Sequence, residues 1–131
     1  IEEGLIASPP IFEFFLKNDA LGDPFINEDH ILFLKLALVE ELAWMKQCSL
    51  EINQILQNLF NQAGLILVDF KLEFGRYKNT IILADEITPD GCRIWDSKTL
   101  EKLDKDRFRR DLGDLVEGYQ IICERLGVSL N

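Results

Sequence analysis

The chain has 131 residues, of which 47% are hydrophobic and 28% charged, and this composition is typical of one globular domain. Its apolar runs all fall short of the roughly 18–20 residues that a membrane-spanning helix needs, so a membrane partner is not expected. The formal net charge of −9 argues against nucleic acid as a partner, because phosphate backbones bind to basic surfaces.

The predicted elements begin with a short strand over residues 11–17, "IFEFFLK". Its alternation places Phe12, Phe14 and Leu16 on one face, and its aromatic content favours a strand over a helix. Turn-forming residues follow, and the Asp23-Pro24 pair fixes an extended or turn geometry at Asp23.

A helical pattern starts at Asn27, with a break expected near residues 35–39. Beyond the break we expect a long amphipathic helix that ends at Gly64, a residue suited to the left-handed conformation of a helix C-terminus. Its apolar positions are spaced by three or four residues: Met45, Cys48, Ile52, Ile55, Leu59 and Ala63.

The segment "LVDFKLEFGRYKNTIILADE", residues 67–86, predicts a β-hairpin, because two apolar runs flank a glycine and a polar loop. Side chains alternate along a strand, so the first run is expected to have an apolar face and a charged face. The apolar face would hold Val68, Phe70, Leu72 and Phe74, and the charged face Asp69, Lys71 and Glu73. Half-solvated antiparallel sheets have this pattern, so alternation alone favours a solvated face.

The carboxylates at the two ends of this segment suggest a second interpretation, a site for a hard cation such as Mg²⁺. Asp85 and Glu86 end the second strand, and Glu73 lies in the first. A two-residue turn would place Asp85 on the core side, away from Glu73, whereas a connection with an odd number of residues would place both on one face. The metal hypothesis predicts the second register.

The remainder of the chain predicts a turn, a short helix and a long helix. The turn contains Pro89, Asp90 and Gly91, and the short helix covers residues 96–103. The last helix is marked by Phe108, Leu112, Leu115, Tyr119, Ile122 and Leu126, and it ends at Gly127. The order β, α, β, β, α predicts an α+β fold with a mainly antiparallel sheet and flanking helices.

Residues 93–110 form a basic island in this acidic chain, with seven Lys and Arg against four Asp and Glu, a local charge of +3. Such an island suits a small anionic ligand. A solvated helical surface with ion pairs four residues apart is the alternative, and composition alone favours that alternative.

The three cysteines, Cys48, Cys92 and Cys123, are far apart, and His30 is the single histidine. This argues against a disulfide framework and a zinc site, and it favours a reducing cytoplasm, where isolated thiols act as small hydrophobes. We interpret His30, near a helix start, as structural or solvent-exposed. The first residues include neither Met nor a signal peptide, so a fragment or a processed chain is expected.

Three stretches resemble the phosphoribosylaminoimidazole-succinocarboxamide synthase (SAICAR synthetase) family: "LILVDFKLEFG" at 65–75, "LADEITPDGCRIWD" at 83–96 and "LDKDRFRRDLG" at 103–113. The stretch "FFLKNDALGDPFIN" at 14–27 fits the same family. The resemblance covers essentially the whole chain. It implies that residues 1–131 are the C-terminal portion of a SAICAR-synthetase-like, ATP-grasp-related fold, and that the family's N-terminal ATP-covering β-domain is not in this chain.

The resemblance implies an activity as well. The family joins carboxyaminoimidazole ribotide to L-aspartate, using ATP and Mg²⁺, and produces SAICAR, ADP and phosphate in purine biosynthesis. A cytoplasmic ATP-dependent carbon–nitrogen ligase is therefore expected, with a homodimer as a family-level expectation. The isolated fragment is expected to be inactive.

Roles follow position by position from the same resemblance. It implies catalytic roles for Lys17, Asp69 and Lys71. It associates Glu73 and Asp85 with ATP-bound Mg²⁺, and Asp23 with the metal at the substrate carboxylate. It places Arg93 at the ribotide phosphate, with Asp90, Lys105 and Arg109 lining the substrate region.

One departure from the family pattern concerns Gly91-Cys92, where the family often has two serines or Gly-Ser. A thiol is a weaker hydrogen-bond donor than a hydroxyl, which puts a side-chain bond from this position in doubt. Two other functions stay open beside the ligase. One is a nucleotide- and Mg²⁺-binding module or inactive fragment without ligase turnover, and the other is an interaction domain with a solvated acidic strand.

Overall fold

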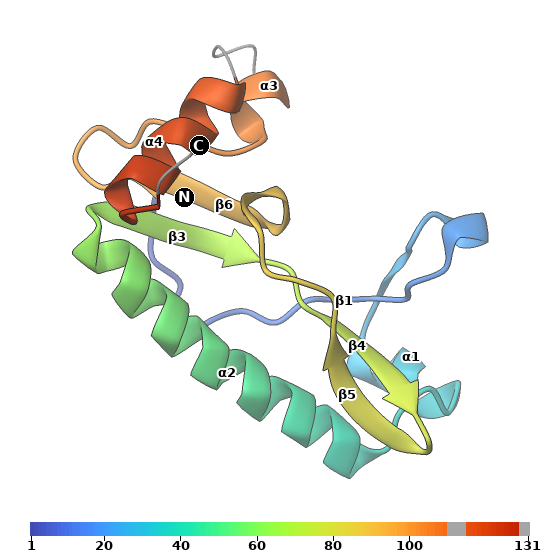
Figure 1. Ribbon diagram of the computed structural model, residues 1–131. Helices are drawn as coiled ribbons and strands as arrows, with labels where there is room; N and C mark the ends of the chain where they lie inside the picture. The colour runs from blue at the N-terminus through green and yellow to red at the C-terminus, as the bar shows by residue number, and fades with distance from the viewer. Residues whose placement is uncertain (110–114, 129–131) are drawn as a thin grey trace. The chain divides into compact units, whose positions relative to one another are not determined.

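The computed structural model describes residues 1–109 and 115–128. The chain divides into two compact units, Ile1–Cys48 and Ser49–Asn131, and each is described by itself. The longest helix, α2 (Val39–Gln62), begins in the first unit and ends in the second (Figure 1). In the described ranges, no helix combines the length and the apolarity needed to cross a bilayer.

The first unit contains a two-stranded ribbon and a short helix. Strand β1 (Phe14–Phe15) pairs antiparallel with β2 (Phe25–Ile26), and the 3-10 helix η1 (Asp19–Leu21) lies between them in sequence. The predicted alternation is confirmed, because Phe12, Phe14 and Leu16 are half-buried while their neighbours are exposed. The regular strand, however, is shorter than the predicted range of 11–17.

Helix α1 (Glu28–Phe33) begins where the sequence predicts, because Asn27 caps its N-terminus. The Asn27 side chain accepts the N–H of His30, and His30 Nδ1 accepts the N–H of Asn27, so His30 has a structural role. The predicted break is confirmed: Lys35 adopts a φ of 53° between α1 and α2. Ile31, Ala37 and Leu42 form a small core with Phe14, Ile26 and Met45.

Helix α2 ends before Gly64, whose φ of 70° confirms its predicted role. The predicted buried stripe is partly wrong, because Ile55 and Leu59 are 66% and 49% exposed. The side chains that pack against the core are Leu56 and Phe60, one position further along the chain in each case. This helix has apolar residues on two neighbouring faces, and on each face they are spaced by three or four positions. The spacing alone therefore does not identify the face that is buried. Trp44, at the start of α2, is also exposed.

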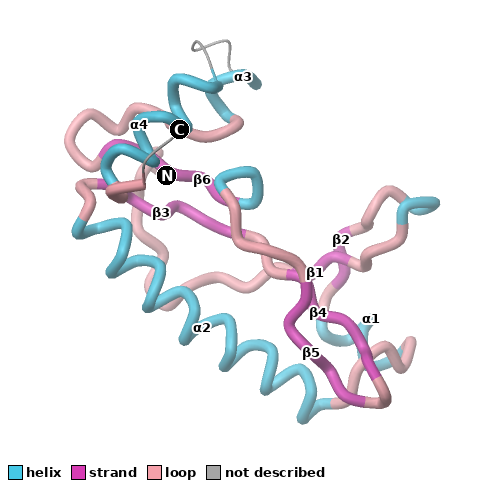
Figure 2. Tube along the Cα trace, viewed as in Figure 1, coloured by secondary structure: helices cyan, strands magenta, loops and turns pink. Residues whose placement is uncertain are grey.

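The second unit divides the predicted hairpin between two antiparallel pairs (Figure 2). Strand β3 (Leu65–Phe70) pairs with β6 (Cys92–Asp96), and β4 (Glu73–Tyr77) pairs with β5 (Thr80–Ala84). Gly75, expected near the turn, lies inside β4. The turn is formed by Lys78 and Asn79, whose positive φ values of 48° and 63° suit a two-residue hairpin.

A β-bulge at Val68 changes which side chains of β3 face the core. Leu67 pairs with Ile94 and Asp69 pairs with Arg93, so Val68 is an extra residue on its strand. Its side chain is 41% exposed, which contradicts the predicted inward orientation. Leu67 is buried and Phe70 still packs against the core, because the alternation restarts after the bulge.

The core of the second unit lies between the β3–β6 pair and helices α2 and α4 (Leu115–Arg125) (Figure 1). Its buried members are Phe60, Leu65, Leu67, Cys92, Ile94, Leu103 and Ile122. The predicted last helix is confirmed in its described part, where Tyr119 and Leu126 also pack against this core. Leu112 and the side chain of Phe108 lie outside the description, and α3 is a short helix, Asp106–Arg109.

The predicted helix over 96–103 is wrong. The side chain of Asp96, at the end of β6, stabilises a turn there instead. Its Oδ1 accepts the N–H groups of Lys98 and Thr99, both at 2.8 Å. Such side-chain bonds to the backbone compete with helix formation. Asp96 also pairs with Arg125 of α4, so one carboxylate joins the sheet edge, the turn and the last helix. The described pairings are all antiparallel, and the predicted α+β class is confirmed.

Gly118 allows α4 to pack closely against the segment before α3. A Cβ at this position would lie 2.6 Å from the Leu103 carbonyl oxygen and 2.8 Å from Arg107 Cδ. Alanine favours a helix interior over glycine by about 1 kcal/mol, but overpacking costs about 1–3 kcal/mol. We therefore expect Gly118→Ala to lower the free energy of unfolding, measured by urea denaturation, by about 1–2 kcal/mol. The control is Gly75→Ala, since nothing lies within 4 Å of its Cβ position. A Gly118→Ala variant as stable as the wild type would contradict this packing.

Asp96 predicts a pH-dependent contribution to stability. Hydrogen bonds from the N–H groups of Thr99 and Lys98, and the Arg125 guanidinium, hold its pKa well below the ordinary value of 3.8. A lowered folded-state pKa stabilises the fold above the unfolded-state pKa, and this gain disappears as the pH falls through the folded-state value. Asp96→Asn should therefore lower the melting temperature at about pH 7, with a smaller difference at about pH 3. Glu124→Gln, at an exposed acid of α4, is the control. Equal differences at both pH values would argue against this ionic role.

Candidate functional site

An acidic pocket of about 250 Å³ lies in the second unit, where the β4–β5 hairpin meets the turn before β6. The pocket is lined by Lys71, Glu73, Asp85, Glu86, Thr88, Asp90 and Gly91. Four carboxylates and one ammonium give these residues a formal charge of −3 at pH 7. The site therefore favours a cation, or an anion that arrives together with a cation.

Backbone structure brings the two sides of the pocket together. Lys71 lies in the link between β3 and β4, and its N–H donates to the Gly91 carbonyl at 2.8 Å. Gly91 ends the 3-10 helix η2 (Pro89–Gly91), in which proline occupies a position where no N–H is needed. The link and η2 are thus joined directly, although they are about twenty residues apart in sequence.

Lys71 and Glu73 are neighbours within the pocket. Lys71 Nζ lies 3.1 Å from Glu73 Oε1, and the Glu73 side chain is much less exposed than that of Lys71, at 18% against 61%. A half-exposed pair of this kind contributes little to stability. Two members of the predicted charged face therefore meet here.

The predicted register between Glu73 and Asp85 is wrong, because Glu73 pairs with Ala84 across a two-residue turn. Strict alternation would place Asp85 on the opposite face from Glu73. Asp85 lies beyond the end of β5, however, and adopts a left-handed φ of 65°. Its Oδ1 accepts the N–H of Glu86 at 2.9 Å. This turn redirects the chain, so Asp85 and Glu73 line the same pocket by a route that alternation does not include.

Left-handed backbone at a non-glycine residue costs free energy and is concentrated at functional sites. Asp85 is one such residue, and aspartate accepts this conformation more readily than most side chains. The pocket wall therefore contains a residue with strained backbone, Asp85.

The guanidinium of Arg93, on β6, forms ion pairs with two carboxylates, Asp69 and Asp106. Its Nη1 lies 2.5 Å from Asp69 Oδ2, and its Nε lies 3.2 Å from Asp106 Oδ2. The β3–β6 register places Asp69 directly opposite Arg93. Asp69 is the main cause of a raised pKa at Arg93, which keeps the guanidinium charged. An incoming phosphate would compete with these carboxylates for the same planar group.

Asp104 is a buried acid that binds the backbone of Ile94, next to Arg93, and the backbone of Asp106. Its Oδ2 accepts the N–H of Ile94 at 2.6 Å and its Oδ1 accepts the N–H of Asp106 at 2.8 Å. Burial raises the pKa of Asp104, and the two N–H bonds oppose that rise. The sequence identifies Asp104 only as one of the acids in the basic island, because its partners are backbone groups.

Asp90 is held by two side chains from later in the chain. Tyr119 Oη donates to Asp90 Oδ1 at 2.6 Å, and Lys105 Nζ lies 3.7 Å from the same oxygen. The structure thus brings together Asp90 and Lys105, two of the predicted substrate-region residues. The sequence predicts Tyr119 only as a core position; its hydroxyl is the one polar group among the apolar side chains predicted for that helix face.

The basic island is divided between two environments. Arg107 is 5% exposed and its Nη1 donates to Glu101 Oε1 at 2.9 Å, so it belongs to the structure of the unit. Lys102 Nζ lies 4.2 Å from the centre of the buried Trp95 ring. These contacts differ from the predicted alternative of a solvated helical surface, because Arg107 is buried and its partner Glu101 lies six residues away, outside any helix. Arg93 and Lys105 instead pair with Asp69, Asp106 and Asp90.

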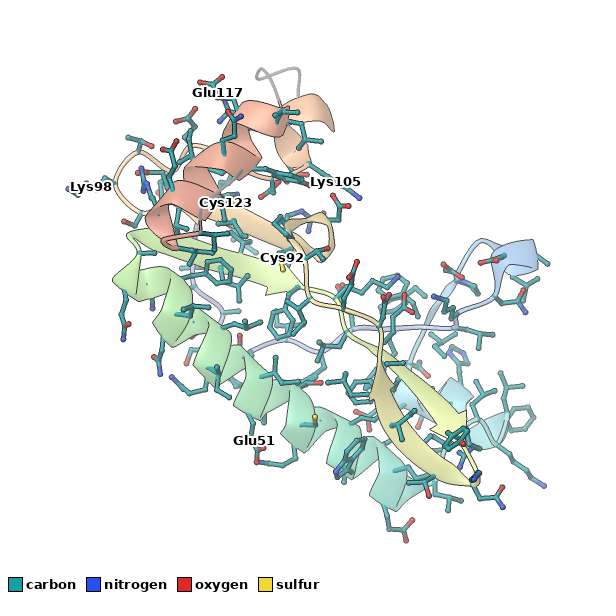
Figure 3. All side chains as sticks on the ribbon, in the orientation of Figure 1. Glu51, Cys92, Lys98, Lys105, Glu117 and Cys123 are labelled. Carbon is teal, nitrogen blue, oxygen red and sulfur yellow. The ribbon has the colours of Figure 1, made fainter. Side chains whose placement is uncertain are left out.

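Cys92, labelled in Figure 3, packs in the core on the opposite side of β6 from Arg93. Its side chain is buried while that of Arg93 is exposed, as strand alternation requires. Burial raises the pKa of the Cys92 thiol to about 11, so the group stays protonated near neutral pH. Cys92 is therefore a core residue, on the core side of the strand.

The remaining predicted site residues are Lys17, Asp23 and Arg109. Lys17 is an exposed residue of the first unit, and Asp23 is a half-buried residue of the same unit. Asp23 Oδ1 accepts the N–H of Asn18 at 2.7 Å, and Asp23 has a φ of 49°. Arg109 ends α3, and its side chain is outside the described part of the chain. Across the described residues, no three His, Cys, Asp or Glu side chains are arranged to hold a metal ion.

Comparison with known proteins identifies relatives over the whole chain. The sequence profile of the SAICAR synthetase family matches residues 1–126. The phosphoribosylaminoimidazole-succinocarboxamide synthase of Pseudomonas aeruginosa (strain LESB58) is 57% identical over 130 residues, which are 99% of this chain and 55% of that protein. That of Pseudomonas putida (strain W619) is 55% identical over the same proportions.

Solved structures give the same relationship. The SAICAR synthetase of Pyrococcus horikoshii OT3 is 47% identical with a TM-score of 0.90, covering 100% of this chain and 58% of that one. A SAICAR synthetase in complex with ADP has a TM-score of 0.91 at 47% identity, covering 100% of this chain and 57% of that one. The chain spans about half the length of the curated relatives it matches. By profile, sequence identity and fold together, it belongs to the SAICAR synthetase family.

Proposed function

We propose that this chain is part of an ATP-dependent ligase that joins carboxyaminoimidazole ribotide to L-aspartate, giving SAICAR, ADP and phosphate. The observation that carries the proposal is the acidic pocket lined together by Lys71, Glu73 and Asp85, in a chain whose profile match covers residues 1–126. With it we propose that the chain is the C-terminal portion of a cytoplasmic, homodimeric enzyme, as the family resemblance implies.

The donor set of the pocket fits Mg²⁺ delivered with a nucleotide. Mg²⁺ prefers oxygen ligands and is usually bound by one or two carboxylates, with substrate phosphates and water completing its shell. Glu73 and Asp85 would be the two carboxylates, and both line the same pocket. Asp23 remains a proposed third acid on the resemblance alone.

The remaining residues would bind and orient the substrates. The Lys71 ammonium, which pairs with Glu73, would offset negative charge as a phosphoryl group moves to the substrate carboxylate. Asp69 and Asp106 hold the Arg93 guanidinium, whose planar geometry suits the ribotide phosphate. Asp90, Lys105 and Arg109 would line the substrate region, and Lys17 would act with Asp23. Amide formation then depends on holding amine and activated carboxylate close together.

A second candidate is a nucleotide- and Mg²⁺-binding module without ligase turnover. The coverage favours it for the isolated chain, because the chain spans 55% of the relatives' length. We therefore expect the 131-residue chain to bind ADP with Mg²⁺ but to release no aspartate-dependent ADP from ATP.

Nucleotide binding by charge variants tests the pocket. Glu73→Gln and Asp85→Asn should each weaken ADP binding in the presence of Mg²⁺ by about tenfold or more, measured by isothermal titration calorimetry, because each removes a metal ligand. In the presence of EDTA the same variants should bind ADP at least as well as the wild type, since a negative charge near the phosphates has been removed.

Glu86→Gln is the matched control, because it removes one carboxylate from the same pocket without removing a proposed ligand. Its affinity for ADP with Mg²⁺ should stay within about threefold of the wild type. Equal weakening by all three substitutions would indicate general electrostatics and would remove Glu73 and Asp85 as specific ligands. A wild-type chain that binds no ADP would favour the interaction-domain alternative.

A further inference from the structure

Tyr119 joins the core of the second unit to the wall of the acidic pocket. Its ring packs against the hydrophobic core, next to the buried Ile122 of the same helix. Its hydroxyl extends beyond that core to Asp90, a pocket-lining residue 29 positions earlier in the sequence. Tyrosine suits such a boundary because its apolar ring and its polar hydroxyl favour opposite environments.

The contact with Asp90 is short and directional. The Oη–Oδ1 distance of 2.6 Å is typical of a hydroxyl that donates to an ionised carboxylate. Lys105, labelled in Figure 3, approaches the same Oδ1 at 3.7 Å from the segment before α3. Both contacts fall on Oδ1, so among the described residues Oδ2 is the oxygen of Asp90 without a hydrogen-bond or ion-pair partner.

The two partners differ in how firmly they hold Asp90. The side chains of Lys105 and Asp90 are 42% and 62% exposed, and an ion pair this exposed fixes orientation poorly. Tyr119 is half-buried and rooted in the core. Burial and the Asp90 carboxylate raise the pKa of Tyr119 far above its ordinary value of 10.0, so its hydroxyl stays a donor over the whole physiological pH range. The phenol is therefore the group that decides where the Asp90 carboxylate sits.

We propose that Tyr119 is a positioning residue for substrate binding: its hydrogen bond to Oδ1 fixes the η2 turn and leaves Asp90 Oδ2 available to a hydrogen-bond donor of the ribotide substrate. A carboxylate only accepts hydrogen bonds, so the group that it recognises is a hydroxyl or an amine. This inference rests on the proposed function, in which Asp90 belongs to the substrate region. Tyr119 itself does not contact the substrate in this arrangement and acts through Asp90.

A comparison of the chain's two tyrosines tests the proposal. Tyr119→Phe removes one oxygen and keeps the ring in the core, whereas Tyr77→Phe removes the same oxygen from an exposed residue of β4. By calorimetry, we expect Tyr119→Phe to weaken binding of carboxyaminoimidazole ribotide about tenfold and to leave ADP with Mg²⁺ within about twofold. Tyr77→Phe should leave both affinities unchanged. Ribotide affinity unchanged in Tyr119→Phe, or equal losses for both ligands, would overturn the proposal.

A double-mutant cycle separates positioning from a general structural effect. If Tyr119 acts through Asp90, the Tyr119→Phe/Asp90→Asn double variant should bind the ribotide no more weakly than Asp90→Asn alone. Additive losses would show that Tyr119 contributes by another route and would overturn the proposal. Melting temperatures of all variants, measured in parallel, identify any variant that fails to fold.

Absorbance titration tests the interaction between Tyr119 and Asp90 without any ligand. In the Tyr77→Phe background Tyr119 is the single remaining tyrosine, so the rise of phenolate absorbance with pH reports its pKa alone. Adding Asp90→Asn should lower that pKa towards 10.0, because the carboxylate that opposes ionisation is gone. Circular dichroism over the same pH range confirms that the chain stays folded. An unchanged Tyr119 pKa in the Asp90→Asn variant would overturn the proposed interaction between Tyr119 and Asp90. A wild-type chain that binds neither ADP nor ribotide would overturn the proposed function, but the titration would still measure this interaction.

Discussion

A buried carboxylate determines how the second unit presents its charges. Asp104 is inaccessible to solvent, and it accepts backbone N–H groups from β6 and from the first turn of α3. Burying an acid is costly unless its oxygens are hydrogen-bonded, so this arrangement holds only while both N–H groups stay in place. Asp106, two residues further along, pairs with Arg93 on β6, so the bonds of Asp104 hold the segments that carry the guanidinium and its acidic partner. The positions of the charged side chains of Arg93 and Asp106 therefore depend on the buried side chain of Asp104.

The pocket depends on a different constraint, the join between the β3–β4 link and η2. The backbone bond from Lys71 to Gly91 brings the start of the hairpin against the turn that precedes β6. The left-handed conformation of Asp85 then returns the end of the hairpin to the same place. An acidic pocket results where the β3–β4 link, the open end of the β4–β5 hairpin and η2 meet.

Much of the local structure could be predicted from the sequence, because it depends on neighbouring residues. The alternation around Phe14, the capping of α1 by Asn27 and the end of α2 at Gly64 each follow from a few adjacent side chains. The errors arise where a single residue changes the geometry. The bulge at Val68 shifts the alternation, and the side chain of Asp96 replaces an expected helix with a turn. The candidate site was predicted in its residue types through family resemblance, but its register was not, and the contact of Tyr119 with Asp90 depends on tertiary structure alone.

The two tryptophans lie in different units and in contrasting environments. Trp95 is buried on β6 beneath the Lys102 ammonium, and Trp44 is exposed at the start of α2 in the other unit. Indole emission shifts to longer wavelength with contact to water, so the two residues act as separable optical probes. Replacing either one by phenylalanine would leave a chain whose fluorescence follows a single unit during unfolding. Tryptophan fluorescence can therefore show whether the two units unfold together or one after the other.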